Sequence, residues 1–234
     1  MTQPAVRNHT PSLDTALDER IHRPPAKIIA RLLSKTPLTP NQVTITTLVP
    51  STLSGLCFLG GNVAWASAGL LFFYLWAIWD HTDGELARLT GKCSEFGQKL
   101  DDLCDNIASM TILCGIFFGM LPFWNEHDKR IFQTLFLTSF FFNIPASILI
   151  VFVKRKNREG AERSWSRFIN CISGREILYF LMFIVLAAYT SKNWFVFSGV
   201  MGTFIIGMYV ISAVYLAEWL RMVFFKQKTY NLPS

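Results

Sequence analysis

Uncharged length is the feature that most constrains how this chain can fold. Five stretches without Asp, Glu, Lys or Arg make up more than half of the 234 residues: 36–79, 106–125, 131–153, 177–191 and 193–217. A helix needs about 20 mostly apolar residues to cross a membrane. The first stretch therefore has room for two such helices, and each of the others has room for one. The sequence predicts an all-α polytopic membrane protein with six transmembrane helices.

The composition excludes other classes of protein. Apolar residues form 51% of the chain and charged residues 16%, which is too apolar for an ordinary soluble domain or a disordered chain. Residues 1–23 are polar, so we expect no signal peptide and no secreted enzyme. Membrane topology accounts for the net charge of +6 better than nucleic-acid binding does. The five cysteines lack metal-site spacing, and we expect them to be free thiols.

The chain divides into four predicted segments. Residues 1–23 form a polar cytosolic tail. In residues 24–35, Lys27, Arg31 and Lys35 recur at intervals of four with apolar residues between them, which predicts a short amphipathic helix on the membrane surface. Residues 36–225 form the membrane domain, and residues 226–234 form a cytosolic tail.

Turn and cap signals place the six helices. Thr39 and Gln42 fit a capping box with Pro40 at the first helical position, and Gly60, Gly61 and Asn62 fit a turn. The predicted helices lie near residues 41–59, 63–89, 96–121, 131–153, 176–191 and 194–222.

The basic residues predict the orientation. With the N-terminus in the cytosol, only Lys129, Arg130 and Lys192 of the 22 Lys and Arg residues lie outside. Such an excess of positive charge on the cytosolic side is typical of membrane proteins. We expect both termini in the cytosol, most naturally of a bacterial inner-membrane protein.

Carboxylates occur where the apolar pattern requires spanning helices. Asp80 and Asp83 are three residues apart near the end of one helix, and Gly97, Asp101 and Asp105 are four apart near the start of the next. Because the two helices are antiparallel, both groups should lie at a similar depth near the cytosol. Ionisable groups at membrane depth are candidates for function.

Four facing carboxylates repel one another, by about 4 kcal/mol for each pair 4 Å apart at an effective dielectric constant of 20. Protons or a divalent cation must therefore enter the site. Oxygen ligands without histidine or thiolate favour Mg²⁺, Mn²⁺ or Ca²⁺. Such a cation, open to the cytosol, suits a diphosphate substrate.

These residues match a longer pattern. Asp80-x-x-Asp83-Gly84-x-x-Ala87-Arg88, eight residues and Gly97-x-x-x-Asp101-x-x-x-Asp105 closely resemble the motif of the CDP-alcohol phosphatidyltransferase family. The six-helix layout, the preceding surface helix and the LTPNQVT segment also resemble that family.

The resemblance implies a reaction in which an alcohol displaces CMP, usually from CDP-diacylglycerol (CDP-DAG), in phospholipid synthesis. It implies that Asp80, Asp83, Asp101 and Asp105 hold Mg²⁺ or Mn²⁺, as two ions, and that Asp105 or Asp101 serves as general base. By the same resemblance the nucleotide-binding residues are Gly84, Ala87, Arg88 and Gly97, with Asn41 and Thr44 as further candidates. The family is often dimeric, which implies a possible homodimer.

The acceptor alcohol is the least determined part of the prediction. Lys154, Arg155 and Arg175 should lie at the cytosolic ends of the fourth and fifth helices, where they could bind a phosphate. We therefore favour a phosphorylated polyol, such as glycerol 3-phosphate or an inositol phosphate, as acceptor. The alternatives in the same family are serine, a neutral alcohol, or transfer of a CDP-linked headgroup to a lipid alcohol. A membrane prenyltransferase and a cation transporter are the alternatives outside it.

Three further features have structural interpretations. His81 should point away from Asp80, because neighbouring residues on a helix differ in direction by about 100°. Glu85 and Asp102 should face water or lipid headgroups. The Gly115-x-x-x-Gly119 pair should pack against another helix, and we slightly favour one from a second copy of the chain.

Overall fold

The computed structural model describes residues 18–139, residue 141 and a set of helical residues between 182 and 220. These residues are helical and contain no strand, as the sequence predicts. In chain order the elements are η1 (Asp18–His22), α1 (Arg23–Leu33), α2 (Pro40–Thr46), α3 (Leu48–Leu59), α4 (Val63–Thr90), α5 (Glu95–Met120) and η2 (Leu121–Phe123). A further helix runs over residues 126–139, and residues 184–190 and 205–210 are also helical.

The predicted first membrane helix is divided into α2 and α3. It begins as expected: the Thr39 side chain accepts from the Gln42 amide, the Gln42 side chain accepts from the Thr39 amide, and Pro40 occupies the first turn. The helix is interrupted at Thr47, three residues before Pro50. Proline has no amide hydrogen and its ring crowds the preceding turn, which accounts for the break.

The α4 and α5 boundaries lie within one residue of those predicted, because local caps fix them. Asn62 caps the start of α4 by accepting a hydrogen bond from the Trp65 amide, at 3.1 Å. Gly91 ends α4 in the left-handed conformation, with φ of 66°. The Ser94 hydroxyl caps α5 by accepting from the Gly97 amide, at 2.9 Å.

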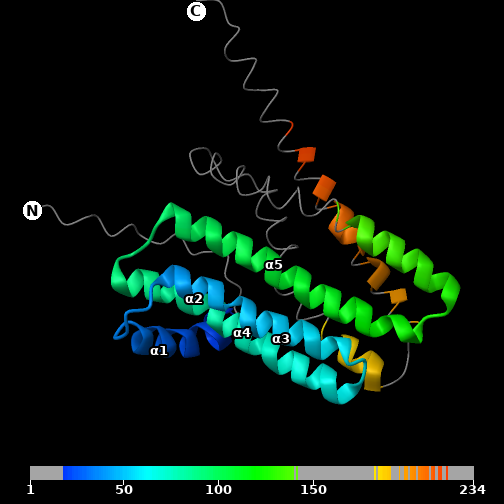
Figure 1. The fold of residues 1–234 in the computed structure, drawn as a ribbon, viewed down its shortest axis with the longest axis horizontal. Coiled ribbons are helices and arrows are strands. Elements are labelled where there is room, and N and C mark those ends of the chain that lie inside the picture. Colours follow the sequence, from blue (N-terminus) through cyan, green and yellow to red (C-terminus); the bar gives the residue numbers. More distant parts are fainter. Residues whose placement is uncertain are drawn as a thin grey trace, which may run out of the picture.

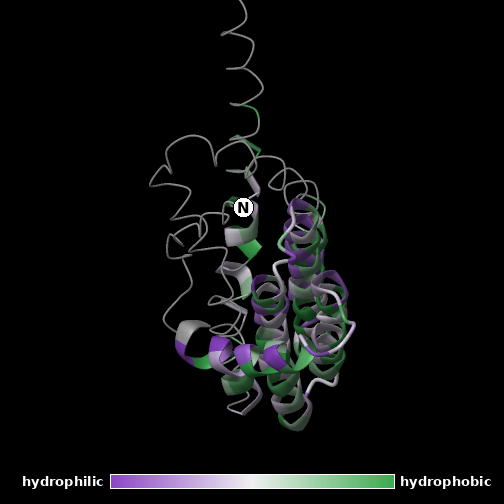
Figure 2. Ribbon diagram, turned by 90° about the vertical axis from the view of Figure 1, so that its left-hand side faces the viewer, coloured by the Kyte–Doolittle hydropathy of each residue, from purple (hydrophilic) through white to green (hydrophobic). Residues whose placement is uncertain are grey.

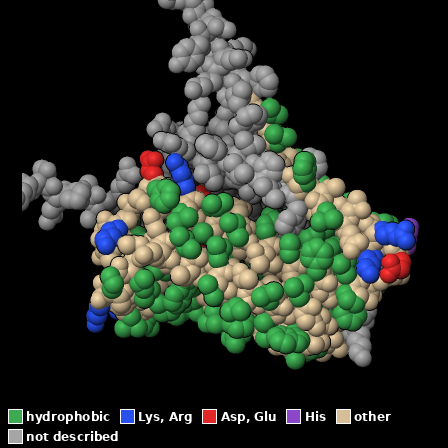
Figure 3. Space-filling view, viewed as in Figure 1, with side chains coloured by type: hydrophobic (Ala, Val, Ile, Leu, Met, Phe, Trp, Pro, Cys, Tyr) green, Lys and Arg blue, Asp and Glu red, His purple; other side chains and the backbone are tan. Residues whose placement is uncertain are grey.

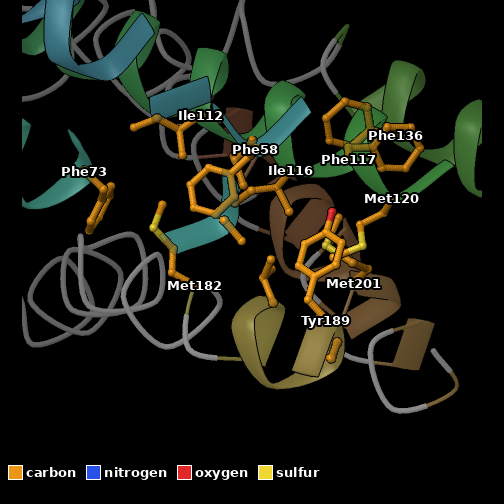
Figure 4. Packing of buried hydrophobic residues seen from close by; sticks show 14 of the residues in the cluster. Phe58, Phe73, Ile112, Ile116, Phe117, Met120, Phe136, Met182, Tyr189 and Met201 are labelled. Carbon is orange, nitrogen blue, oxygen red and sulfur yellow. The ribbon is translucent and has the colours of Figure 1, made fainter. Parts of the chain in front are cut away.

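The long helices lie side by side, with α2, the end of α4 and the start of α5 together at the left of Figure 1. Within the bundle, Phe58 of α3 and Phe117 of α5 lie in one hydrophobic core that extends to residues of the later helices, including Met182 and Tyr189 (Figure 4). This core reaches Ala77 of α4 and Ala108 of α5, each three residues away from a motif aspartate.

The glycines of α5 allow it to approach α3 closely. A Cβ added to Gly115 would lie 2.1 Å from the Gly55 carbonyl oxygen, and one added to Gly119 would lie 2.1 Å from the Phe58 carbonyl oxygen. The expectation that this glycine pair packs against a second copy of the chain is therefore wrong. Backbone contact within one chain occupies this face of α5.

Helix α1 packs against α4. Its Ala26 and Ala30 are fully buried, whereas Ile28 and Leu32 are each 61% exposed. Hydrophilic and hydrophobic residues alternate along α1 in Figure 2. The helix therefore uses its small residues to contact the bundle and leaves larger apolar residues, together with Lys27 and Arg31, on the outside.

The surface of the bundle has a broad apolar region. In Figure 3, charged side chains gather towards the two ends of the long axis, and hydrophobic side chains cover much of the face between them. Three stretches of helix are long and apolar enough to cross a membrane: Pro40–Leu59, Val63–Thr90 and Glu95–Phe123. The described part of the chain thus supports an integral membrane protein.

Candidate active site

Three of the four motif aspartates meet between α4 and α5. One carboxylate oxygen from each of Asp80, Asp101 and Asp105 lies within 4.8 Å of those from the other two. Asp80 is ten residues before the end of α4, and Asp105 is ten residues after the start of α5. At 1.5 Å per residue, both lie about 15 Å from the same end of the bundle. The similar depth expected from the sequence is confirmed.

Burial makes this acidic group costly without a compensating charge. Asp80 is 6% exposed, Asp101 and Asp105 are partly buried, and the Oδ1 atom of Asp105 is inaccessible to water. Carboxylates that share a partly dehydrated site favour a cation or protonation. The three converging donors are all oxygen atoms, so they fit a hard divalent cation.

Asp83, the fourth motif aspartate, lies outside this group of three. Its side chain is 6% exposed, and its Oδ2 atom accepts a hydrogen bond from the Thr44 hydroxyl of α2. The structure therefore places Thr44 against a motif carboxylate. The sequence had suggested only a nucleotide contact for Thr44, since it gives no direct sign of a pair that is 39 residues apart.

Asn41 and Gly97 also bring α2 close to α5. A Cβ added to Gly97 would lie 3.0 Å from the Asn41 Oδ1 atom and 3.1 Å from the Ser94 hydroxyl oxygen. The absence of a side chain at position 97 thus leaves room for the Asn41 amide. Both residues lie at the same end of the bundle as the aspartates.

The remaining α4 motif residues lie on the turns after Asp83. The Arg88 guanidinium donates to Glu85, with 2.8 Å between Nη2 and Oε1. A Cβ added to Gly84 would lie 3.5 Å from Arg88 Nη1, so the guanidinium extends back over this glycine. Ala87 is partly buried on the same helix.

The expectation that Glu85 faces water or lipid headgroups is wrong. Its side chain is 12% exposed and pairs with Arg88, so it does not face bulk water or headgroups. The signal in the sequence was an arginine three residues further along the same helix, a spacing that favours such pairs. Asp102 is partly buried rather than fully exposed.

His81 points away from the aspartates, as expected. Its ring stacks on that of His22, with 6.0 Å between the ring centroids, at the junction of η1 and α1. His22 in turn contacts the Tyr74 ring. The histidine therefore packs α4 against the N-terminal segment.

Four cysteines, at positions 57, 93, 104 and 114, are free thiols, as predicted. The candidate acceptor residues Lys154, Arg155 and Arg175 lie outside the described residues. Their placement near the site stays a prediction.

A comparison with protein families decides the family of this chain. The family model described as CDP-alcohol phosphatidyltransferase matches residues 37–227, which include the whole aspartate motif. The chain belongs to the CDP-alcohol phosphatidyltransferase family. The resemblance expected from the sequence is thereby confirmed.

The curated relatives in this family include inositol phosphate lipid synthases. The archaetidylinositol phosphate synthase of Pyrococcus horikoshii is 36% identical over 101 residues, which are 43% of this chain and 52% of the relative. The phosphatidylinositol phosphate synthase of Corynebacterium glutamicum is 31% identical over 139 residues, 57% of this chain and 59% of the relative. The matches span about half the length of these relatives.

Solved structures of the family share the fold. The Mycobacterium tuberculosis phosphatidylinositol phosphate synthase with CDP-DAG bound superposes with a TM-score of 0.54 at 22% identity, covering 83% of this chain and 92% of that chain. The same enzyme in complex with manganese and citrate gives 0.55 at 20% identity, covering 83% and 88%. A CDP-alcohol phosphatidyltransferase fold therefore extends over most of this chain.

Proposed function

We propose that this protein is a phosphatidyltransferase of phospholipid synthesis that transfers the phosphatidyl group of CDP-DAG to an alcohol and releases CMP. The convergence of Asp80, Asp101 and Asp105 carries the proposal. A partly buried group of carboxylate oxygens near one end of a membrane bundle suits a site for a cation and a diphosphate. Family membership and the relatives named above support the same chemistry.

The four aspartates would hold the metal. Asp80, Asp101 and Asp105 form the converging set, and Asp83 is the neighbouring ligand; we propose Mg²⁺ or Mn²⁺, as two ions. The manganese-bound relative supports a divalent ion of this size and hardness. When bound, the metal would neutralise the diphosphate oxygens and stabilise CMP as a leaving group.

The protein residues then bind and orient the substrates. Arg88, at the edge of the site, would contact the CDP diphosphate, beside Gly84 and Ala87. Asn41 and Gly97 lie where α2 and α5 meet, and Thr44 lies against α4. All three would border the nucleotide.

The reaction exchanges one phosphorus–oxygen bond for another. The acceptor hydroxyl oxygen forms a bond to the phosphorus that bears the diacylglycerol. The bond from that phosphorus to the bridging oxygen breaks, and its electron pair leaves with CMP. Asp105 or Asp101 takes the hydroxyl proton, since both carboxylates lie at the point where the two helices converge.

An inositol phosphate is the acceptor that we favour. The curated relatives are named for the synthesis of archaetidylinositol phosphate and phosphatidylinositol phosphate. Lys154, Arg155 and Arg175 would bind its phosphate through charge-assisted hydrogen bonds that a neutral alcohol lacks. Glycerol 3-phosphate is the second candidate.

The proposed placement in the membrane puts this site in the cytosol. Among the described residues, the basic side chains at the aspartate end are Arg20, Arg23, Lys27, Arg31, Lys35, Arg88, Lys92 and Lys99, whereas Lys129 and Arg130 lie at the opposite end. This asymmetry supports cytosolic termini and a bacterial inner-membrane location. We keep six transmembrane helices over residues 36–225, with polar tails at 1–23 and 226–234.

Helix α1 would then lie at the cytosolic membrane surface. Its exposed Ile28 and Leu32 can enter the lipid while Lys27 and Arg31 contact headgroups. A homodimer stays a prediction. Gly115 and Gly119 do not support it, because α3 covers both glycines.

An acceptor panel tests the proposed function. Purified full-length protein is incubated with radiolabelled CDP-DAG, Mg²⁺ or Mn²⁺, and an inositol phosphate, glycerol 3-phosphate, free inositol or serine. We expect CMP and a new phospholipid in equal amounts with the inositol phosphate, and far less with inositol or serine. Equal use of serine would overturn the acceptor assignment, and no CMP with any acceptor would overturn the function.

A further inference from the structure

The contact between Thr44 and Asp83 points beyond the nucleotide role suggested by the sequence. We infer that Thr44 is a positioning residue that fixes the Asp83 carboxylate at the edge of the metal site. This inference rests on the proposed function for the metal-binding role of Asp83. It concerns how the site is held together, which neither the motif nor the family membership specifies.

The Thr44 hydroxyl has two acceptors within reach and one proton to donate. One is the Pro40 carbonyl oxygen, 3.1 Å away in the preceding turn of α2, and the other is Asp83 Oδ2 in α4. An ionised carboxylate is the stronger acceptor, because hydrogen bonds to charged groups are stronger than those to neutral carbonyl oxygens. The contact across the two helices therefore outweighs the bond within α2.

The surroundings hold Thr44 in the orientation that this contact needs. Thr44 is 3% exposed, and its neighbour Val43 packs in a cluster with Ala30 of α1 and Leu86 of α4. A second bond between the same two helices joins Trp79 Nε1 to the Thr46 hydroxyl, at 2.8 Å. Helix α2 is thus fixed on α4 on both sides of Thr44.

Thr47 joins α2 to α3 and has helical dihedral angles, with φ of −60° and ψ of −26°. Helices α2 and α3 together form the stretch Pro40–Leu59, which is long enough to cross a membrane. Where α2 meets α4, α2 presents the Thr44 hydroxyl and α4 presents the Asp83 carboxylate. A group that orients a metal ligand through a hydrogen bond typically changes metal affinity about 10–100-fold when removed.

Manganese binding tests this inference without any substrate. Free Mn²⁺ is measured by electron paramagnetic resonance during titration of the purified full-length protein in detergent. We expect Thr44→Val to weaken Mn²⁺ binding by about 10-fold or more, and Thr44→Ser, which keeps the hydroxyl, to bind Mn²⁺ much as wild type does. Thr44→Ala gives the same comparison if the valine variant does not fold.

Thr47→Val is the matched control. Thr47 is 1% exposed, and its hydroxyl donates to the Thr44 carbonyl oxygen at 2.6 Å within the same segment. Its removal should lower the melting temperature but leave Mn²⁺ affinity unchanged. If Thr44→Val and Thr47→Val affect Mn²⁺ binding equally, or neither does, Thr44 has only a structural role and the inference is wrong.

A double-mutant comparison locates the effect at Asp83. In an Asp83→Asn background, Thr44→Val should cause little further loss of Mn²⁺ affinity, because the carboxylate it positions is already gone. A full additional loss would contradict the inference. These titrations need no CDP-DAG, so their result does not depend on the acceptor panel. A protein that releases no CMP would overturn the proposed function, whereas the Mn²⁺ affinities alone decide the role of Thr44.

Discussion

Gly115 of α5 and Gly55 of α3 pack backbone against backbone, so that a Cβ on Gly115 would lie 2.1 Å from the Gly55 carbonyl oxygen. No real contact is that short, and the obstacle is main chain rather than a flexible side chain. The two helices would have to separate to admit even one methyl group. Residues Ile112 and Ile116, on the same helix, belong to the adjoining core.

Gly115→Ala is therefore expected to destabilise the protein. Overpacking typically costs about 1–3 kcal/mol, and the melting temperature in detergent should fall accordingly. Gly207→Ala is the control, because a Cβ there meets no atom of the described residues within 4 Å. Equal melting temperatures for the two variants would show that α3 and α5 are not in backbone contact.

Glu85→Gln tests the pairing of Glu85 with Arg88. The change keeps the shape of the side chain but removes the charge that holds the guanidinium near the site. We expect the KM for CDP-DAG to rise about fivefold, the equivalent of roughly 1 kcal/mol for a partly exposed ion pair. The KM for the acceptor should not change.

Glu126→Gln is the matched control for that substitution. Glu126 pairs with Lys129 at the same spacing, with 3.4 Å between the charged atoms, but at the opposite end of the bundle. It should leave both KM values unchanged. If Glu85→Gln behaves like this control, Arg88 does not depend on Glu85 for its position.

Thiol labelling in intact cells tests the orientation. Cys93 is exposed in the turn between α4 and α5, at the aspartate end, whereas Glu126 is exposed at the other end. With the other cysteines removed, Cys93 should resist an impermeant maleimide and a cysteine introduced by Glu126→Cys should react. The opposite labelling pattern would place the aspartates outside the cytosol.

Local signals in the sequence predicted the α4 and α5 boundaries well. Asn62, which belongs to the predicted turn, caps the start of α4 in the structure, and Gly91 and Ser94 are further caps that the prediction did not name. The equal depth of Asp80 and Asp105 followed from helix geometry alone. These features depend on residues close together in the sequence.

Features that depend on packing between distant segments were less predictable. The break at Thr47 had a local signal in Pro50, but the apolar run suggested one continuous helix. The partner of Gly115 and the contact of Thr44 with Asp83 join helices far apart in the chain. Spacing shows which residues share a face, but not which neighbour that face contacts.

Two neighbouring carboxylates on α5 offer the most direct test of the whole account. Asp101 belongs to the converging group with Asp80 and Asp105, whereas Asp102 does not. The measurement is the rate of CMP release from CDP-DAG by purified Asp101→Asn and Asp102→Asn proteins with an inositol phosphate and Mg²⁺ or Mn²⁺ present. We predict a loss of about a hundredfold for Asp101→Asn and near wild-type release for Asp102→Asn; equal rates in the two variants would contradict the assignment of the active site.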